Sequence, residues 1–197
     1  TKVRAMQSKL IKEAQYQEIA QMHSVTAIVS YLKKQPGFQD LWADLDENSL
    51  HRGDVEKLLI HTIYQNFAKL YRFANPEQRT FMALYFKRYE LEIMKECLRK
   101  VFDQGHAELD LSLFKDFFDR HSKLNIEKLA NSSTVEEFIS GLEGSEYYKP
   151  LKKLGNDYTP RIFDYGMALD QYYFANIWSV KDCLLYTSDA ADDTPCV

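Results

Sequence analysis

The sequence predicts an all-α protein, and three observations support this class. Glycine and proline are scarce, with 7 Gly and 5 Pro among 197 residues, which argues against a turn-rich β architecture. Leu, Lys, Glu, Ala and Gln, all good helix formers, are frequent. Apolar residues recur at helical spacing over long stretches. Since 45% of the residues are hydrophobic, we expect one substantial core rather than disorder.

The first half of the chain predicts one short helix and two long ones. Ser24 can cap the short helix, and Pro36-Gly37 ends it. A long helix over residues 48–74 ends at Asn75-Pro76, and its partner in a hairpin covers residues 77–102, followed by Gln104-Gly105. Apolar residues surround most of this second helix, so we expect it to be buried on more than one side. Its remaining face can hold ion pairs such as Arg88 with Glu92 and Glu96 with Lys100.

The second half predicts two more short helices and a final long one. Residues 109–118 form the first, and a capping box, Ser133 with Glu136 or Thr134 with Glu137, starts the second, which Gly144 closes. A turn over residues 156–160 leads into a helix over residues 161–179, for which we find no partner in the chain. We therefore expect this helix to expose a large aromatic surface, made of Phe163, Met167, Tyr172, Tyr173, Phe174, Ile177 and Trp178. Such a surface is unusual for a soluble monomer, so we expect the natural protein to continue beyond this helix.

Two blocks of sequence recur in the same order, which indicates a duplicated helical unit. Residues 24–32 align with residues 134–142 at an offset of 110, and residues 67–71 align with residues 174–178 at an offset of 107. Chance similarity between apolar helices is the alternative explanation. On the first interpretation, residues 1–118 are one helical repeat unit and residues 119–182 are an incomplete second one.

The last residues differ from the rest of the chain. The run from Cys183 to Val197 lacks helical periodicity and looks like translated sequencing-adapter DNA, so we treat residues 183–197 as a non-native tail. The other cysteine, Cys97, stands within a helical pattern and is expected to be a small core residue. Three scattered cysteines do not form a disulfide framework.

Charge and hydropathy exclude several classes. The net charge is −4, basic residues alternate with acidic ones, and no nucleic-acid partner is expected. No apolar stretch approaches the ~20 residues of a membrane-spanning helix, and the first ten residues do not resemble a signal peptide. A cytoplasmic location is the default expectation.

No motif for catalysis, nucleotide binding or metal binding is found, so we expect no catalytic residues, no cofactor and no metal. The five histidines, His106 among them, lack partners at ligand spacing, and no phosphate-binding loop or nucleophile elbow occurs. Glu90 and Glu92 are two residues apart on a helix and do not face each other, so we place them on a salt-bridged surface beside Lys87, Arg88 and Lys95. We also expect no compact site where three ionisable groups with shifted pKa values converge.

Several segments together resemble the C subunit of V-type (archaeal/vacuolar-type) ATPases and ATP synthases, the counterpart of the eukaryotic d subunit. The resemblance spans residues 1–182, and these segments carry it: Arg4-Ala-Met-Gln-Ser-Lys-Leu10, Leu50-His-Arg52, Phe67-Ala-Lys-Leu-Tyr71, Tyr85-Phe-Lys-Arg-Tyr-Glu90 with Lys95 and Leu98-Arg99, and Ala168-Leu-Asp-Gln-Tyr-Tyr-Phe174. The family is built from three copies of a helical unit arranged as a funnel. The resemblance therefore implies that this chain holds one copy and most of a second.

The resemblance implies a function as a non-catalytic rotor adaptor. Such an adaptor lies on the cytoplasmic face of the membrane, links the central stalk to the membrane ring, and transmits torque for ATP-coupled proton or sodium transport. Its partners would be the central-stalk subunits and the ring, with only indirect membrane association. Candidate partner contacts are Arg72, Arg79, Arg88, Lys95 and Arg99, for which a solvated face or intramolecular pairing is the alternative. The rival functions are a helical-repeat scaffold that binds another protein or peptide, and a helical enzyme.

Overall fold

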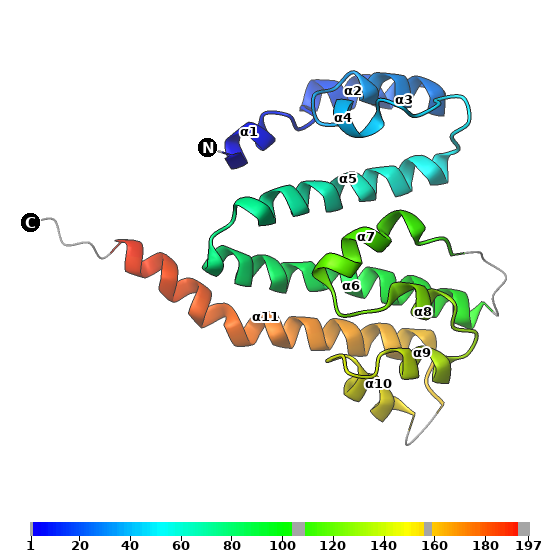
Figure 1. Ribbon diagram of the computed structural model, residues 1–197, viewed down its shortest axis with the longest axis vertical. Coiled ribbons are helices and arrows are strands. Elements are labelled where there is room, and N and C mark those ends of the chain that lie inside the picture. Colours follow the sequence, from blue (N-terminus) through cyan, green and yellow to red (C-terminus); the bar gives the residue numbers. More distant parts are fainter. Residues whose placement is uncertain (1, 104–108, 156–158, 193–197) are drawn as a thin grey trace, which may run out of the picture. The chain divides into compact units, whose positions relative to one another are not determined.

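The computed structural model describes the backbone of residues 2–103, 109–155 and 159–192, and side chains as far as Ser179 (Figure 1). Over these ranges it contains eleven α-helices and no strand, which confirms the all-α prediction. The chain divides into two compact units, unit 1 with residues Thr1–Ala74 and unit 2 with residues Asn75–Val197. None of the helices in the described ranges is long and apolar enough to cross a membrane.

Unit 1 packs four short helices with one long helix. These are α1 (Lys2–Gln7), α2 (Glu13–Ala20), α3 (Val25–Lys33), α4 (Gln39–Trp42) and α5 (Arg52–Phe73). The predicted cap is present, because the Ser24 hydroxyl accepts a hydrogen bond from the Ala27 amide at 3.1 Å. Helix α5 starts later than the predicted residue 48, since the Asp54 carboxylate accepts the His51 amide hydrogen bond at 2.9 Å and so satisfies the helix start there.

The core of unit 1 centres on Trp42, which is 1% exposed. The Phe38 ring meets it edge to face at 5.0 Å between centroids, and Val29 and Val55 belong to the same buried cluster. The indole Nε1 of Trp42 donates to the Thr62 hydroxyl on α5 at 3.1 Å. The short α4 is therefore fixed to the long helix by both apolar packing and a buried hydrogen bond.

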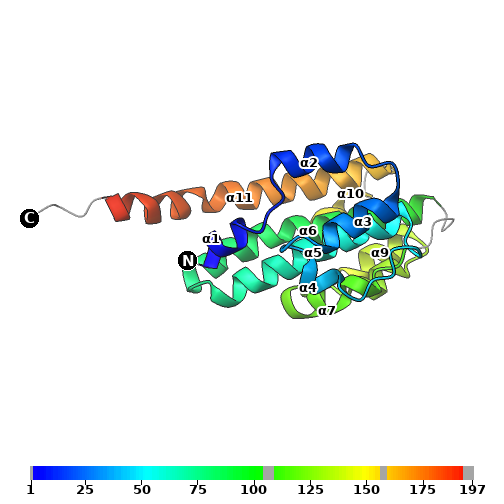
Figure 2. The same cartoon turned by 90° about the horizontal axis from the view of Figure 1, so that it is seen from above.

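Unit 2 is organised around two long antiparallel helices. Its elements are α6 (Pro76–Phe102), α7 (Ser112–His121), α8 (Ile126–Ala130), α9 (Val135–Gly141), α10 (Tyr148–Leu154) and α11 (Ile162–Asp192). Asn75 caps α6, accepting from the Gln78 amide at 2.8 Å, and Pro76 occupies the first helical position. Helix α11 runs beside α6 in both views (Figures 1 and 2). The buried residues of α6 fall in one broad arc of about 160° around the helix. Phe81 and Tyr85 lie outside this arc and are exposed, so burial on more than one side is not confirmed.

The prediction that the last helix has no partner in the chain is wrong, because α6 is its partner. Tyr165, Leu169 and Tyr173 of α11 are 4%, 1% and 8% exposed within unit 2. These residues are four apart, so they form one seam on the helix. Of the seven residues expected to be exposed, Tyr173 is therefore buried and Tyr172 and Ile177 are half-buried, while four remain exposed: Phe163, Met167, Phe174 and Trp178.

The predicted duplication stays a prediction, and the order of helices gives it a structural outline. In both places a short helix, a second short helix and a long helix follow one another, as α3, α4 and α5 and again as α9, α10 and α11. The Thr134 hydroxyl caps α9 by accepting from the Glu137 amide at 3.1 Å, as Ser24 caps α3. The repeat boundaries at residues 118 and 182 stay predictions. The hairpin predicted for the two helices joined at Asn75-Pro76 also stays a prediction, because α5 and α6 belong to different units.

Some predictions fall on residues that the structure does not describe. Gln104-Gly105, His106, part of the turn over residues 156–160, and Cys196 lie outside the described ranges. The backbone of α11 continues to Asp192 and so includes residues 183–192 of the tail. That the tail is non-native stays a prediction.

Candidate functional site

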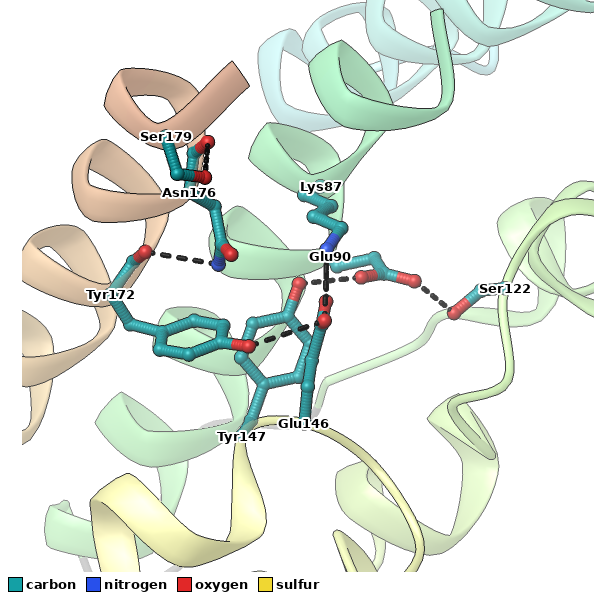
Figure 3. Close-up of polar contacts among 8 residues, drawn as sticks. All are labelled: Lys87, Glu90, Ser122, Glu146, Tyr147, Tyr172, Asn176 and Ser179. Atoms are coloured by element: carbon teal, nitrogen blue, oxygen red, sulfur yellow. Dashed lines mark hydrogen bonds and ion pairs between the residues drawn. The ribbon is translucent and has the colours of Figure 1, made fainter. Parts of the chain in front are cut away.

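A buried carboxylate on α6 is the centre of a polar cluster in unit 2 (Figure 3). Glu90 is 7% exposed. Its Oε1 accepts a hydrogen bond from the Ser122 hydroxyl at 2.5 Å, and its Oε2 accepts one from the Tyr147 hydroxyl at 2.6 Å. The donors stand 32 and 57 residues further along the chain, so folding of the whole unit is required to assemble this site.

A second carboxylate, Glu146, lies next to this core on the more exposed side. It forms an ion pair with the ammonium of Lys87 at 2.6 Å and accepts a hydrogen bond from the Tyr172 hydroxyl at 3.2 Å. The rings of Tyr147 and Tyr172 meet edge to face at 5.7 Å. The cluster therefore connects α6 with the end of α7, the start of α10 and α11 (Figure 3).

Helix ends place the two hydroxyl donors. Ser122 is the C-cap of α7, and its Oγ also accepts the Leu124 amide at 3.0 Å, so the side chain is held in the turn that leads to α8. Tyr147 is the N-cap of α10. The segment before it turns at Gly144, whose φ of +83° favours glycine because a Cβ is strained in this region.

Burial dominates the electrostatics of the cluster. Desolvation raises the pKa of Glu90, and the hydrogen bonds from Ser122 and Tyr147 oppose this by stabilising the carboxylate. Burial, followed by the neighbouring Glu90 charge, raises the pKa of Tyr147. The phenol consequently stays protonated and acts as a donor.

One expectation about this region is wrong. Glu90 does not lie on a salt-bridged surface, because its side chain points into the unit and only Lys87 of the flanking cations pairs nearby, with Glu146. Two ionisable groups with shifted pKa values, Glu90 and Tyr147, meet here, which is fewer than the three that would count against the expectation of no such site. Both oxygens of Glu90, however, already accept hydrogen bonds from this same chain at 7% exposure, an arrangement that stabilises packing and leaves a substrate no direct access.

One of the two ion pairs predicted along α6, that of Glu96 with Lys100, is replaced by other contacts. Glu96 pairs with Arg99, three residues away. The ammonium of Lys100 donates instead to the carbonyl of Ala130 at the end of α8, at 2.6 Å. Among the residues that the structure describes, no group of three His, Cys, Asp or Glu side chains is arranged to hold a metal ion.

The five predicted partner contacts are divided between the two units. Arg72 is exposed on α5 in unit 1, while the other four are on α6 in unit 2. Arg79 and Arg88 are nine residues apart, about two and a half turns, so they lie on opposite sides of α6. Lys95 is half-buried, and its ammonium pairs with Asp170 of α11 at 2.6 Å. This is the intramolecular pairing that was the alternative to a partner contact. Arg88 and Arg99 are exposed on the same helix.

The fold and the site define an all-α protein with an internally satisfied polar cluster. Residues 1–191 match the family described as ATP synthase (C/AC39) subunit. The chain therefore belongs to this family.

Individual relatives agree with the family match. The chain is 26% identical over 181 residues to the C subunit of the A-type ATP synthase of Methanocaldococcus jannaschii, covering 89% of this chain and 44% of that protein. It is 26% identical over 182 residues to the protein of the same name from Methanosarcina mazei, covering 90% and 48%. For that of Methanosphaera stadtmanae the identity is 24% over 196 residues, covering 98% and 46%. The chain spans about half the length of these relatives. No solved structure matches.

Proposed function

We propose that this chain is part of a non-catalytic rotor adaptor of an A/V-type ATP synthase or ATPase. In this role it links the central stalk to the membrane ring on the cytoplasmic face and transmits torque for ATP-coupled transport of protons or sodium ions. The observation that carries the proposal is the family match over residues 1–191, together with relatives named as ATP synthase subunits.

The packing of unit 2 supports a mechanical role. Helix α6 is fixed to α11 by the ion pair between Lys95 and Asp170, to α10 by the hydrogen bond between Glu90 and Tyr147, and to α8 by Lys100. A part that transmits torque needs several elements that move together rather than an activated nucleophile. Dense packing joined by polar contacts between helices suits this requirement.

The exposed arginines of α6 are the proposed contacts to the stalk. Arg88 and Arg99 are eleven residues apart, about three turns, so they lie on one side of the helix. Arg99 pairs with Glu96 at the surface, and an exposed pair of this kind is weak enough to exchange for a partner carboxylate. Arg72 in unit 1 and Arg79, on the opposite side of α6 from Arg88, stay candidates too. Lys95 is the weakest candidate, because Asp170 already holds its ammonium.

Copurification and ion pumping test the proposal together. The full-length product of the source gene, carrying an affinity tag, should be purified with stalk and ring subunits from detergent-solubilised membranes. Membrane vesicles from cells lacking the protein should retain ATP hydrolysis but lose ATP-driven ion pumping, and adding the protein back should restore pumping. Copurification with neither stalk nor ring would reject the adaptor and favour the helical-repeat scaffold.

A charge reversal tests the arginine contacts separately. The double substitution Arg88→Glu with Arg99→Glu should weaken stalk binding while the ring still copurifies. Arg120→Glu, at an exposed arginine of α7, is the matched control and should leave both interactions unchanged. Equal binding by the double variant and the control would remove Arg88 and Arg99 from the contact surface.

A further inference from the structure

Helix α11 carries a second apolar side that unit 2 leaves uncovered. Phe163, Met167, Phe174 and Trp178 are 69%, 41%, 63% and 67% exposed, and we call them the α11 stripe. Their spacing of four, seven and four residues places them in one row along the helix. The row extends over about four turns, or roughly 22 Å of helix. The segment that carries it is the orange part of α11 in Figure 1.

The α11 stripe lies opposite the side that packs within unit 2. Successive residues are rotated by about 100° around a helix, so the seam of Tyr165, Leu169 and Tyr173 faces away from the stripe. A helix that is apolar on two opposite sides is normally packed between two layers. Unit 2 supplies one layer, and the exposed α11 stripe indicates that a second layer covers the other side of the helix.

The size of the α11 stripe argues against a second copy of the chain as its cover. Four side chains of roughly 200 Å² each, exposed to the fractions above, present on the order of 500 Å² of mostly apolar surface. A stable interface between separate molecules requires about 800 Å² on each partner. A segment of the same polypeptide does not have this requirement, because the chain connection removes most of the entropy cost of association.

The lengths of the relatives identify a source for such a segment. The matched chain covers only 44% of the relative from Methanocaldococcus jannaschii and 48% of that from Methanosarcina mazei. We propose that the α11 stripe is the docking site for an amphipathic helix from the half of the full-length polypeptide that this chain does not span. The helix must present apolar residues along its contact row, because the stripe itself consists of exposed apolar side chains.

A tryptophan measurement tests this inference independently of the rotor function. The sequence has two tryptophans, Trp42 at 1% exposure and Trp178 at 67%. The difference between the unmodified protein and its Trp178→Phe variant isolates the fluorescence of Trp178. In the 197-residue chain, acrylamide should quench this signal efficiently. In the full-length product of the source gene, we expect severalfold weaker quenching and emission at shorter wavelength.

A matched pair of substitutions in the full-length protein gives a second measurement that does not depend on the shorter chain being stable. Phe174→Glu places a charge in the α11 stripe and should restore quenching of Trp178. Ala175→Glu, at the exposed neighbouring position, should not. Efficient quenching of Trp178 in the full-length protein would overturn the proposal, and so would a source gene that encodes no further residues. Protection of Trp178 that rises with the concentration of the 197-residue chain would overturn it too, because it would assign the stripe to a second copy.

Discussion

Removing a single oxygen atom, in Tyr147→Phe, tests the buried cluster of unit 2 most directly. The Tyr147 ring is 2% exposed and keeps its packing in the variant, so little cavity forms. The change removes the hydroxyl that donates to Glu90 Oε2 at 2.6 Å. At 7% exposure, Glu90 has little access to water that would replace this donor. A hydrogen bond to a buried charged group contributes about 1.5–3 kcal/mol, and we expect a loss of about 2 kcal/mol of unfolding free energy.

The neighbouring tyrosine provides the control. The Tyr148 hydroxyl accepts a hydrogen bond from Lys152 and donates one to Glu143, both at the surface. Tyr148→Phe makes the same chemical change and should alter the unfolding free energy by no more than about 0.5 kcal/mol. Urea unfolding at about pH 7 followed by circular dichroism measures both variants. Equal stabilities of the two variants would show that the contact between Tyr147 and Glu90 contributes nothing, and the cluster would lose its proposed structural role.

Three further predictions concern the same unit. Burial raises the folded-state pKa of Glu90, so the folded state binds the proton more tightly than the unfolded state does. The contribution of Glu90 to the free energy of unfolding therefore falls as pH rises through the folded-state pKa. Glu90→Gln should remove this pH-dependent contribution from a pH series of unfolding curves. Burial raises the pKa of Cys97 to about 12, so in the Cys183→Ser, Cys196→Ser protein its thiol should react with a thiol reagent only on unfolding. Phe118→Ala should cost about 3–5 kcal/mol in urea unfolding, since the ring is fully buried.

Each of these outcomes has a clear opposite. An unchanged pH dependence in Glu90→Gln would show that other groups cause it. Rapid modification of the remaining thiol in the native protein would place Cys97 at an accessible site. A loss below about 1 kcal/mol in Phe118→Ala would mean that the neighbouring rings, Phe86 at 5.6 Å and Phe117 at 5.8 Å, collapse into the space.

Local features of the fold were predictable because their causes are local. Ser24 and Thr134 start helices since each hydroxyl accepts an amide hydrogen bond three residues ahead, a pattern visible in the sequence. Asn75-Pro76 likewise ends one helix and starts the next through a cap and a proline at the first helical position. The all-α class follows from such signals repeated along the chain.

The partner of the last helix was missed because two apolar rows compete on α11. Phe163 and Met167 begin one row, and Tyr165 and Leu169 begin the other, each at a spacing of four residues. Sequence periodicity gives a helix with two apolar sides, but it does not say which side meets α6. Contacts between residues as far apart as Lys95 and Asp170 decide this, and they are not encoded in either segment alone.

The same reason explains why Glu90 was assigned to the surface. Its sequence neighbours Lys87 and Arg88 suggested a charged helix face, yet a helix rotates about 100° per residue and Glu90 lies with buried Phe86 on another side. The residues that make this burial tolerable, Ser122 and Tyr147, carry no motif and stand far along the chain. A lone buried carboxylate is costly, so the position is acceptable only in the assembled unit.

The contacts of α6 give the rotor hypothesis a mechanical form. Along this helix, Glu90, Lys95 and Lys100 each bond to a different element, so a force on α8, α10 or α11 reaches α6 through short polar contacts. Polar contacts have directional geometry, so they add a defined register to the close packing of these helices. Removing the half-buried ion pair between Lys95 and Asp170 should lower the free energy of unfolding by only about 0.2–1 kcal/mol. It should nevertheless reduce the stiffness of the unit. In an adaptor, Lys95→Ala would then lower the ratio of ions pumped to ATP hydrolysed without dissociating the complex, whereas a passive scaffold would show no such change.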